Sequence, residues 1–157
     1  MIGLFSPSLK IPDAADWIIT QIKQFKPVCI VNATSFSGKG ASGVSPLDAG
    51  DVPVFQVALS TSNRAAWMEA DRGLSPADMA MHVVLPEVDG RILAGVASFK
   101  EPGKQDKNLE FSRIEHQPDK ERILAITDKV SRWYKLQTKP LETQKAALIL
   151  STYPGRP

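Results

Sequence analysis

Short apolar segments of strand length alternate along this chain with segments whose apolar residues recur at helical spacing. Residues 28–31 and 54–59 are mainly apolar runs, typical of strands that are covered on both faces. Residues 12–26, just before the first run, carry apolar side chains three and four positions apart, as on one side of a helix. This order leaves few folds open, because strands joined by helices pair side by side in one sheet.

The pattern predicts an α/β domain with a mainly parallel sheet and helices on both faces, similar to the three-layer Rossmann-like and flavodoxin-like folds. Residues 101–108 are polar and contain Pro and Gly, so we expect a mobile surface loop there. Helices are expected at 12–26, 63–70, 75–85 and 118–136, and strands at 2–5, 28–31, 54–59, 92–99 and 145–150.

The chain has 157 residues, about the length of one domain. An expected strand begins directly after Met1, and the last expected strand is followed only by a short turn-rich segment. Domains usually begin and end with some slack. We therefore expect residues 1–157 to be a single α/β domain excised from a much larger multidomain chain.

Charge and hydropathy exclude several classes of protein. The chain has 19 Lys and Arg against 17 Asp and Glu, a net charge of +2, without the concentrated positive charge that nucleic acids require. It has no apolar run near the roughly 18 residues of a membrane span and no secretory signal pattern. Its one cysteine, Cys29, cannot form an intramolecular disulfide. We expect a cytoplasmic protein that binds no nucleic acid and does not span a membrane.

Residues 37–43 superficially resemble a phosphate-binding loop. They follow an expected strand, but Gly38 and Lys39 are followed by Gly40, and no helical pattern begins there. A true P-loop ends in Gly-Lys-Ser or Gly-Lys-Thr, so that the lysine opens a helix beside the phosphates. We interpret the segment as a flexible connection at the carboxyl end of a strand, where open α/β sheets bind ligands.

An acidic segment at residues 86–91 is the clearest candidate for chemistry. Glu87 and Asp89 follow the end of an expected helix, and His82 lies five residues before Glu87. Carboxylate and imidazole groups bind borderline metals, and a buried carboxylate can accept a proton. The structural alternative is a simple turn in which Glu87 pairs with Arg91.

Other polar residues are less specific. Asn32 and Ser35 come just beyond a buried strand, where they could contact a ligand or cap their own loop. His82 and His116 are the only histidines, so a site with three histidines within this chain is excluded. We expect His116 to be exposed.

Several longer segments together carry a family resemblance. Two of them are specific: an expected helix that leads into the sequence PEVDGR, and the closing sequence STYPGRP. The full set of segments is residues 31–37, 45–48, 52–57, 73–92, 98–101 and 147–157. In this order they resemble the large, tetrapyrrole-binding subunit of aerobic cobaltochelatase and, more distantly, the porphyrin-binding subunit of magnesium chelatase. The closing segment favours the cobalt branch.

The resemblance implies a metal-inserting enzyme that forms nitrogen–metal bonds. Its large subunit places Co²⁺, as the substrate metal, into hydrogenobyrinic acid a,c-diamide during cobalamin biosynthesis, while ring-forming partner subunits hydrolyse ATP. Insertion needs a base for the pyrrole N–H groups and weak ligands for the metal. The resemblance therefore implies that Glu87 is the catalytic base and that Glu87 and His82 are transient metal ligands. It also implies that the isolated domain is inactive. Substrate contacts are expected from Asn32, Ser35, Gln56 and Asp89.

Two other functions stay open at this stage. The domain could be a non-catalytic module of the same subunit that braces the substrate cavity or docks the ATPase ring. Docking would use the basic face of the helix at 118–136, which carries Lys120, Arg122, Lys129, Arg132 and Lys135. If the family resemblance is set aside, the sequence pattern is also compatible with a small flavodoxin-like protein that binds a nucleotide.

Overall fold

The computed structural model describes residues 1–40, 42–106, 108 and 110–149, and within them the strands form one sheet. Its order is β1–β2–β3–β4, from β1 (Ile30–Asn32), β2 (Val54–Leu59), β3 (Ile92–Asp106) and β4 (Phe111–Pro118). β1 pairs parallel with β2 and β2 parallel with β3, whereas β4 pairs antiparallel with β3. The sheet is therefore mixed, with a parallel centre and an antiparallel edge.

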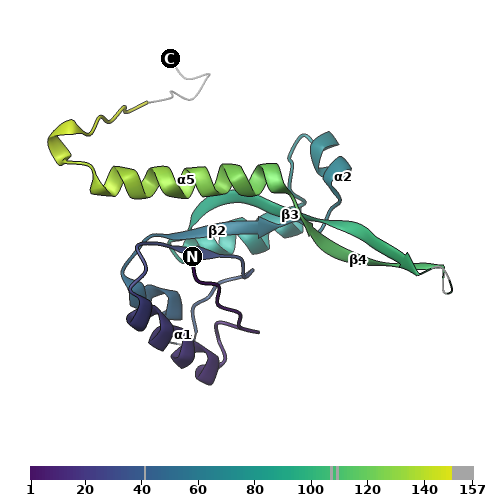
Figure 1. Cartoon of the computed structure of the whole chain (residues 1–157), viewed down its shortest axis with the longest axis horizontal. Coiled ribbons are helices and arrows are strands. Elements are labelled where there is room, and N and C mark those ends of the chain that lie inside the picture. The colour runs from purple at the N-terminus through teal and green to yellow at the C-terminus, as the bar shows by residue number, and fades with distance from the viewer. Residues whose placement is uncertain (41, 107, 109, 150–157) are drawn as a thin grey trace, which may run out of the picture.

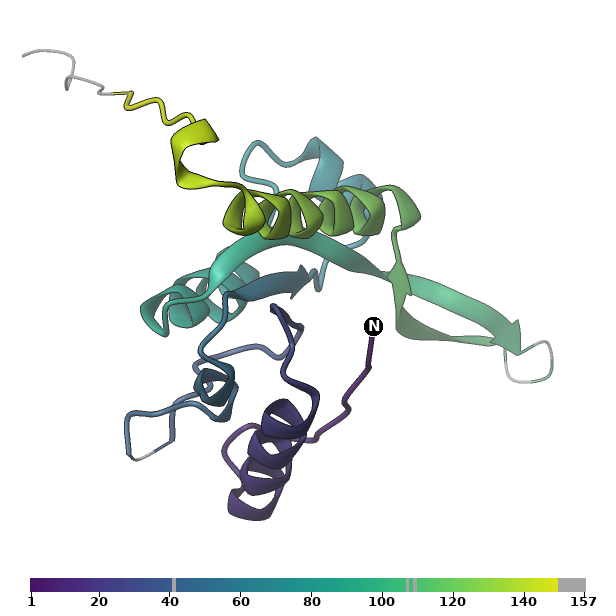
Figure 2. The ribbon, with the colours of Figure 1, turned by 60° about the vertical axis from the view of Figure 1, so that its left-hand side comes forward.

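Helices cover both faces of this sheet, which confirms the predicted α/β class. The long helix α5 (Lys120–Thr138) lies along one face, and α1 (Pro12–Phe25) lies on the opposite side (Figures 1 and 2). A continuous helical segment, α3 (Pro76–Met79), the π-helical turn η2 (Ala80–Val84) and α4 (Leu85–Val88), packs near β2. The short elements are α2 (Arg64–Glu69) and the 3₁₀ turns η1 (Pro46–Gly50) and η3 (Leu141–Thr143).

Four expectations about strands and loops were wrong. The strand expected at 28–31 and covered on both faces is β1, which starts only at Ile30, and Val28 and Val31 are exposed. Residues 2–5 and 145–149 are not in the sheet, and residue 150 lies outside the described residues. An apolar run becomes a strand only where its backbone N–H and C=O groups find a partner strand, and among the described residues neither run pairs with β1, β2, β3 or β4. Residues 101–106 are the end of β3, not a loop. They pair with β4 to form a hairpin that projects from the body (Figure 1).

The core has two clusters of buried side chains on either side of the middle of β2. Phe55, the second residue of β2, is fully buried, and its ring makes a T-shaped contact with Trp133 of α5 at a centroid distance of 5.9 Å. Packing of this kind attaches α5 to the parallel strands. The first cluster contains Leu9, Ile18, Ile22, Leu47 and Val54, and the second contains Ala58, Leu74, Val96 and Phe99.

Two of the basic residues predicted for the outer face of α5 turn toward the rest of the domain. The Arg122 guanidinium stacks 4.5 Å above the Trp67 ring and donates to the Val96 carbonyl. Lys129 donates from Nζ to the Leu93 carbonyl at 2.6 Å. The basic face is therefore smaller than the sequence pattern indicated, because these two long side chains lie along the sheet. No helix in the described part of the chain is long and apolar enough to cross a bilayer.

Candidate functional site

A cleft of about 580 Å³ opens beyond the carboxyl ends of β1 and β2. Its walls are residues 7–10, the loop at residues 33–37 that follows β1, Leu59 at the end of β2, and both histidines. Ligands of open α/β folds bind beyond the carboxyl ends of parallel strands, where loops diverge. This cleft, which we call the β1–β2 cleft, is therefore the candidate site.

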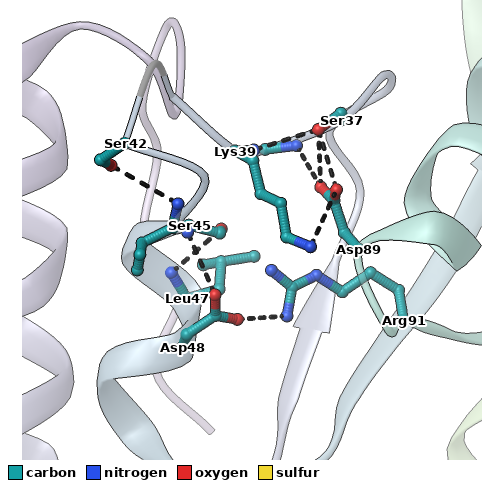
Figure 3. Close-up of polar contacts among 10 residues, drawn as sticks. Ser37, Lys39, Ser42, Ser45, Leu47, Asp48, Asp89 and Arg91 are labelled. Carbon is teal, nitrogen blue, oxygen red and sulfur yellow. Dashed lines mark hydrogen bonds and ion pairs between the residues drawn. The ribbon is translucent and has the colours of Figure 1, made fainter.

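The loop that forms one wall of the β1–β2 cleft is fixed at two points. The backbone N–H of Phe36 donates to the Met81 carbonyl in η2 at 2.7 Å. One residue further, the hydroxyl of Ser37 and the N–H of Gly38 donate to the Asp89 carboxylate, the latter at 2.6 Å (Figure 3). The loop is thus held against the helical segment that carries His82, and the wall of the cleft is preformed.

Asp89, a predicted substrate contact, is occupied by this loop. Its side chain is only 2% exposed, and Lys39 brings its Nζ to 3.9 Å from the carboxylate (Figure 3). The hydrogen bonds that the carboxylate accepts from Ser37 and Gly38 are charge-assisted, which is the stronger class of hydrogen bond. In this structure Asp89 therefore positions the cleft wall, and direct contact with a substrate stays a prediction.

Asn32 and Gln56 support the start of the same loop from adjacent strands. Asn32 donates from Nδ2 to Gln56 Oε1 at 2.7 Å and accepts from the backbone N–H of Thr34. Gln56 donates to the Thr34 carbonyl at 2.9 Å. Both side chains are buried, so their polar groups are used within the protein. Of the four predicted substrate contacts, Ser35 is the one that lines the β1–β2 cleft.

The cleft brings the two histidines of the chain to one place. His82 comes from η2 and His116 from β4, and the charge of His116 is felt at His82. Desolvation is the main cause that lowers the pKa of each ring: His82 is buried, and His116 is partly screened from water although its residue is exposed overall. Both imidazoles are therefore mainly neutral near pH 7, the form that accepts a proton or binds a metal. His116 also shares a hydrogen bond between Nδ1 and Ser98 Oγ at 3.2 Å.

His116 was expected to be exposed, and it is, but the sequence patterns did not indicate its place at the cleft. Its position depends on the pairing of β4 with β3, where it stands opposite Lys100. No local signal in the polar segment around it indicates that pairing.

Glu87 lies elsewhere. It is exposed on α4 and is not among the described residues that line the β1–β2 cleft. The alternative pairing of Glu87 with Arg91 is not what the structure shows, since Arg91 bonds to Asp48 at 2.8 Å (Figure 3). Nor do the described residues contain a cluster of three or more His, Cys, Asp or Glu side chains able to hold a metal. A metal bound here would need further ligands from the substrate or from outside this chain.

Comparison with known proteins assigns the chain to a family. The family model of CobN/magnesium chelatase matches residues 2–157. The chain belongs to this family. The aerobic cobaltochelatase subunit CobN of Pseudomonas aeruginosa is 36% identical over 143 residues, 90% of this chain. The chloroplastic magnesium-chelatase subunit ChlH of Oryza sativa subsp. japonica is 24% identical over 133 residues, 80% of this chain.

A solved structure shows the same fold in this family. The catalytic subunit of cobaltochelatase from Mycobacterium tuberculosis matches 86% of the chelatase-family chain, with a TM-score of 0.64 and 28% identity. The chain spans 12% of that protein, 11% of the Pseudomonas subunit and 9% of the Oryza subunit. The resemblance read from the sequence motifs is thereby confirmed.

Proposed function

We propose that this chain is one domain of the large, tetrapyrrole-binding subunit of an ATP-dependent cobaltochelatase. The subunit would be cytoplasmic and would insert Co²⁺ into hydrogenobyrinic acid a,c-diamide in cobalamin biosynthesis, with ATP hydrolysed by partner subunits. Sequence identity favours the cobalt branch, because the chain is 33–36% identical to the CobN proteins and 24–28% identical to the magnesium-chelatase subunits. The observation that carries the proposal is the β1–β2 cleft with its two histidines.

Metal insertion asks the protein for proton acceptors and for weak metal ligands. Two pyrrole nitrogens lose their protons, and the substrate Co²⁺ exchanges its waters for ring nitrogens. Neutral imidazole suits both tasks, because it accepts protons near pH 7 and is a good ligand for first-row divalent metals. Two imidazoles alone hold Co²⁺ loosely enough for its release to the ring. We assign these tasks to His82 and His116, and Glu87 stays a predicted base, to be compared with them by substitution.

Phe36 is suited to contact the face of a flat macrocycle. Its backbone has φ of 66°, a left-handed conformation that bulky residues rarely adopt, and its side chain is 51% exposed. The ring lines the cleft instead of packing in the core. Hydrogen bonds from the Phe36 N–H and from the next two residues, Ser37 and Gly38, hold this strained conformation in place. Backbone strain that the surrounding structure maintains is typical of functional sites.

The substitution Phe36→Ala in the full-length subunit should weaken tetrapyrrole binding by roughly fivefold, because a lost aromatic contact removes about 1 kcal/mol. The measurement is a fluorescence-quenching titration of the subunit with the metal-free substrate. The matched control is Val44→Ala, since Val44 is 60% exposed and does not line the cleft. Equal affinities for Phe36→Ala and the unmodified subunit would remove Phe36 from the binding surface.

Photo-cross-linking tests whether this domain faces the substrate. Ser35 lines the cleft and is only half-buried, so a benzophenone amino acid at that position in the full-length subunit should couple to the bound tetrapyrrole on irradiation. The same probe at Lys23, which is exposed on α1 and does not line the cleft, should give no coupling. Coupling from neither position would place the substrate site outside this domain.

The docking alternative has less support from the structure. Of the five basic residues that would form the docking face, Arg122 and Lys129 are engaged with the sheet, and Arg132 pairs with Asp128 at 2.8 Å. Too little free positive charge is left on α5 to favour an acidic partner.

A further inference from the structure

Two buried polar atoms behind the β1–β2 cleft have no hydrogen-bond partner in the described part of the chain. They are Oδ1 of Asp78 and Nδ1 of His82. Asp78 is 0% exposed and His82 is 6% exposed, so bulk water does not satisfy either atom. An unpaired buried polar atom costs about 1–3 kcal/mol. Two such atoms beside a candidate site require an explanation.

The two residues are neighbours on one helical segment. Asp78 is in α3 and His82 follows four positions later in η2, a spacing that brings side chains to the same side of a helix. The charge of Asp78 acts on His82 and also on His116.

The other oxygen of Asp78 is already used. Oδ2 accepts from the N–H of Thr61 at 2.9 Å, from the Thr61 hydroxyl at 3.0 Å and, more weakly, from the Ser60 hydroxyl at 3.4 Å. These bonds fix the carboxylate to the end of β2. Oδ1 is therefore the acceptor that remains for His82.

We propose that Asp78 is a positioning residue for His82. Oδ1 accepts a hydrogen bond from Nδ1–H of His82, through one bridging water or after a small rotation of the ring. This keeps the proton on Nδ1, so that Nε2 carries the lone pair that faces the cleft. Carboxylate partners fix the tautomer and raise the basicity of metal-binding histidines in the same way. The inference rests on the proposed function, because Co²⁺ is the metal that Nε2 would receive.

The test is the steady-state kinetics of Co²⁺ insertion by the full-length subunit with its partners. In Asp78→Asn the amide oxygen still accepts from Thr61, which turns the NH₂ group toward His82 and favours the opposite tautomer. The KM for Co²⁺ should rise about 10–100-fold, with the KM for the tetrapyrrole changed by less than about twofold. The matched control is Thr61→Val, which removes a bond to Oδ2 but leaves Oδ1 free, so its KM for Co²⁺ should stay near that of the unmodified subunit.

A second variant leaves the carboxylate in place. Incorporating Nδ1-methylhistidine at position 82 removes the same donor, and it should raise the KM for Co²⁺ by a similar factor even if Asp78→Asn does not fold. An unchanged KM for Co²⁺ in either folded variant, while His82→Ala loses insertion, overturns the positioning role and leaves the proposed function standing. Full insertion activity in His82→Ala overturns the use of His82 in the proposed function itself.

Discussion

Replacing His82 with alanine in the full-length subunit should slow Co²⁺ insertion by about 100-fold or more, because a positioned acid–base group contributes typically 10²–10⁴-fold. Tetrapyrrole affinity should stay nearly unchanged, since the ring is 6% exposed and offers little contact area to the substrate. The measurement is the initial rate of formation of the cobalt product, followed by its visible absorption, together with a binding titration of the metal-free substrate.

Two further variants make this result specific. His82→Gln keeps most of the volume and a polar group, so it should fold like the unmodified protein and still insert Co²⁺ slowly. Glu87→Gln tests the sequence-based prediction that Glu87 is the base, which requires that chelation is lost while substrate binding is kept. If Glu87→Gln is inactive and His82→Ala is active, the base lies on α4 and the β1–β2 cleft is not where protons are taken up.

Replacing Asp89 with alanine should release the wall of the cleft. The substitution leaves the hydroxyl of Ser37 and the N–H of Gly38 without their acceptor, and each unpaired buried group costs about 1–3 kcal/mol. A loss of about 2 kcal/mol raises the open population of the loop roughly 30-fold. Trypsin cleavage after Lys39 reports this opening directly, because the rate follows the open population when reclosing is fast. Tetrapyrrole binding should weaken in parallel.

Asp89→Asn and Ser37→Ala calibrate the effect. Asn keeps one acceptor oxygen for the Gly38 N–H, and Ser37→Ala removes one donor while leaving the carboxylate bonded to Gly38. Both should increase cleavage after Lys39 less than Asp89→Ala does. A cleavage rate in Asp89→Ala equal to that of the unmodified protein would mean that the contact with η2 through Phe36 is enough to hold the loop.

Local signals in the chain predicted the helices well. Asn63 and Ser75, the first residues of two of the expected helical segments, cap α2 and α3 by accepting from the N–H groups of Ala66 and Asp78. A cap and a helical period involve residues within a few positions of one another, so they are visible without knowledge of the fold. The same is true of β2, an apolar run that is buried as predicted. The burial of β1 was not predictable in this way, because exposure of Val31 depends on what the fold places beside the strand.

The hairpin and the cleft were not predictable in this way. The polar residues of β4 form a strand because β3 offers them an edge, and the apolar residues 145–149 have no such partner in the described sheet. His82 and Ser35 were candidates from the sequence, but His116 joins them only through β4. Glu87, the leading candidate, ends on the outside of α4 because the neighbouring turn buries Asp89 instead.

The sequence by itself determined the class of fold, the family and the places where helices begin, since these depend on neighbours along the chain and on recurrent motifs. Tertiary structure decided which polar groups meet. Asp78 shows the difference: its N–H donates to the hydroxyl of Ser75, which caps the helix three residues earlier in the chain, whereas its carboxylate is bound by Thr61 beyond the end of β2. The hydrogen-bond partners of a buried side chain are residues distant in sequence, because a buried polar group bonds to the groups that the packed fold places next to it.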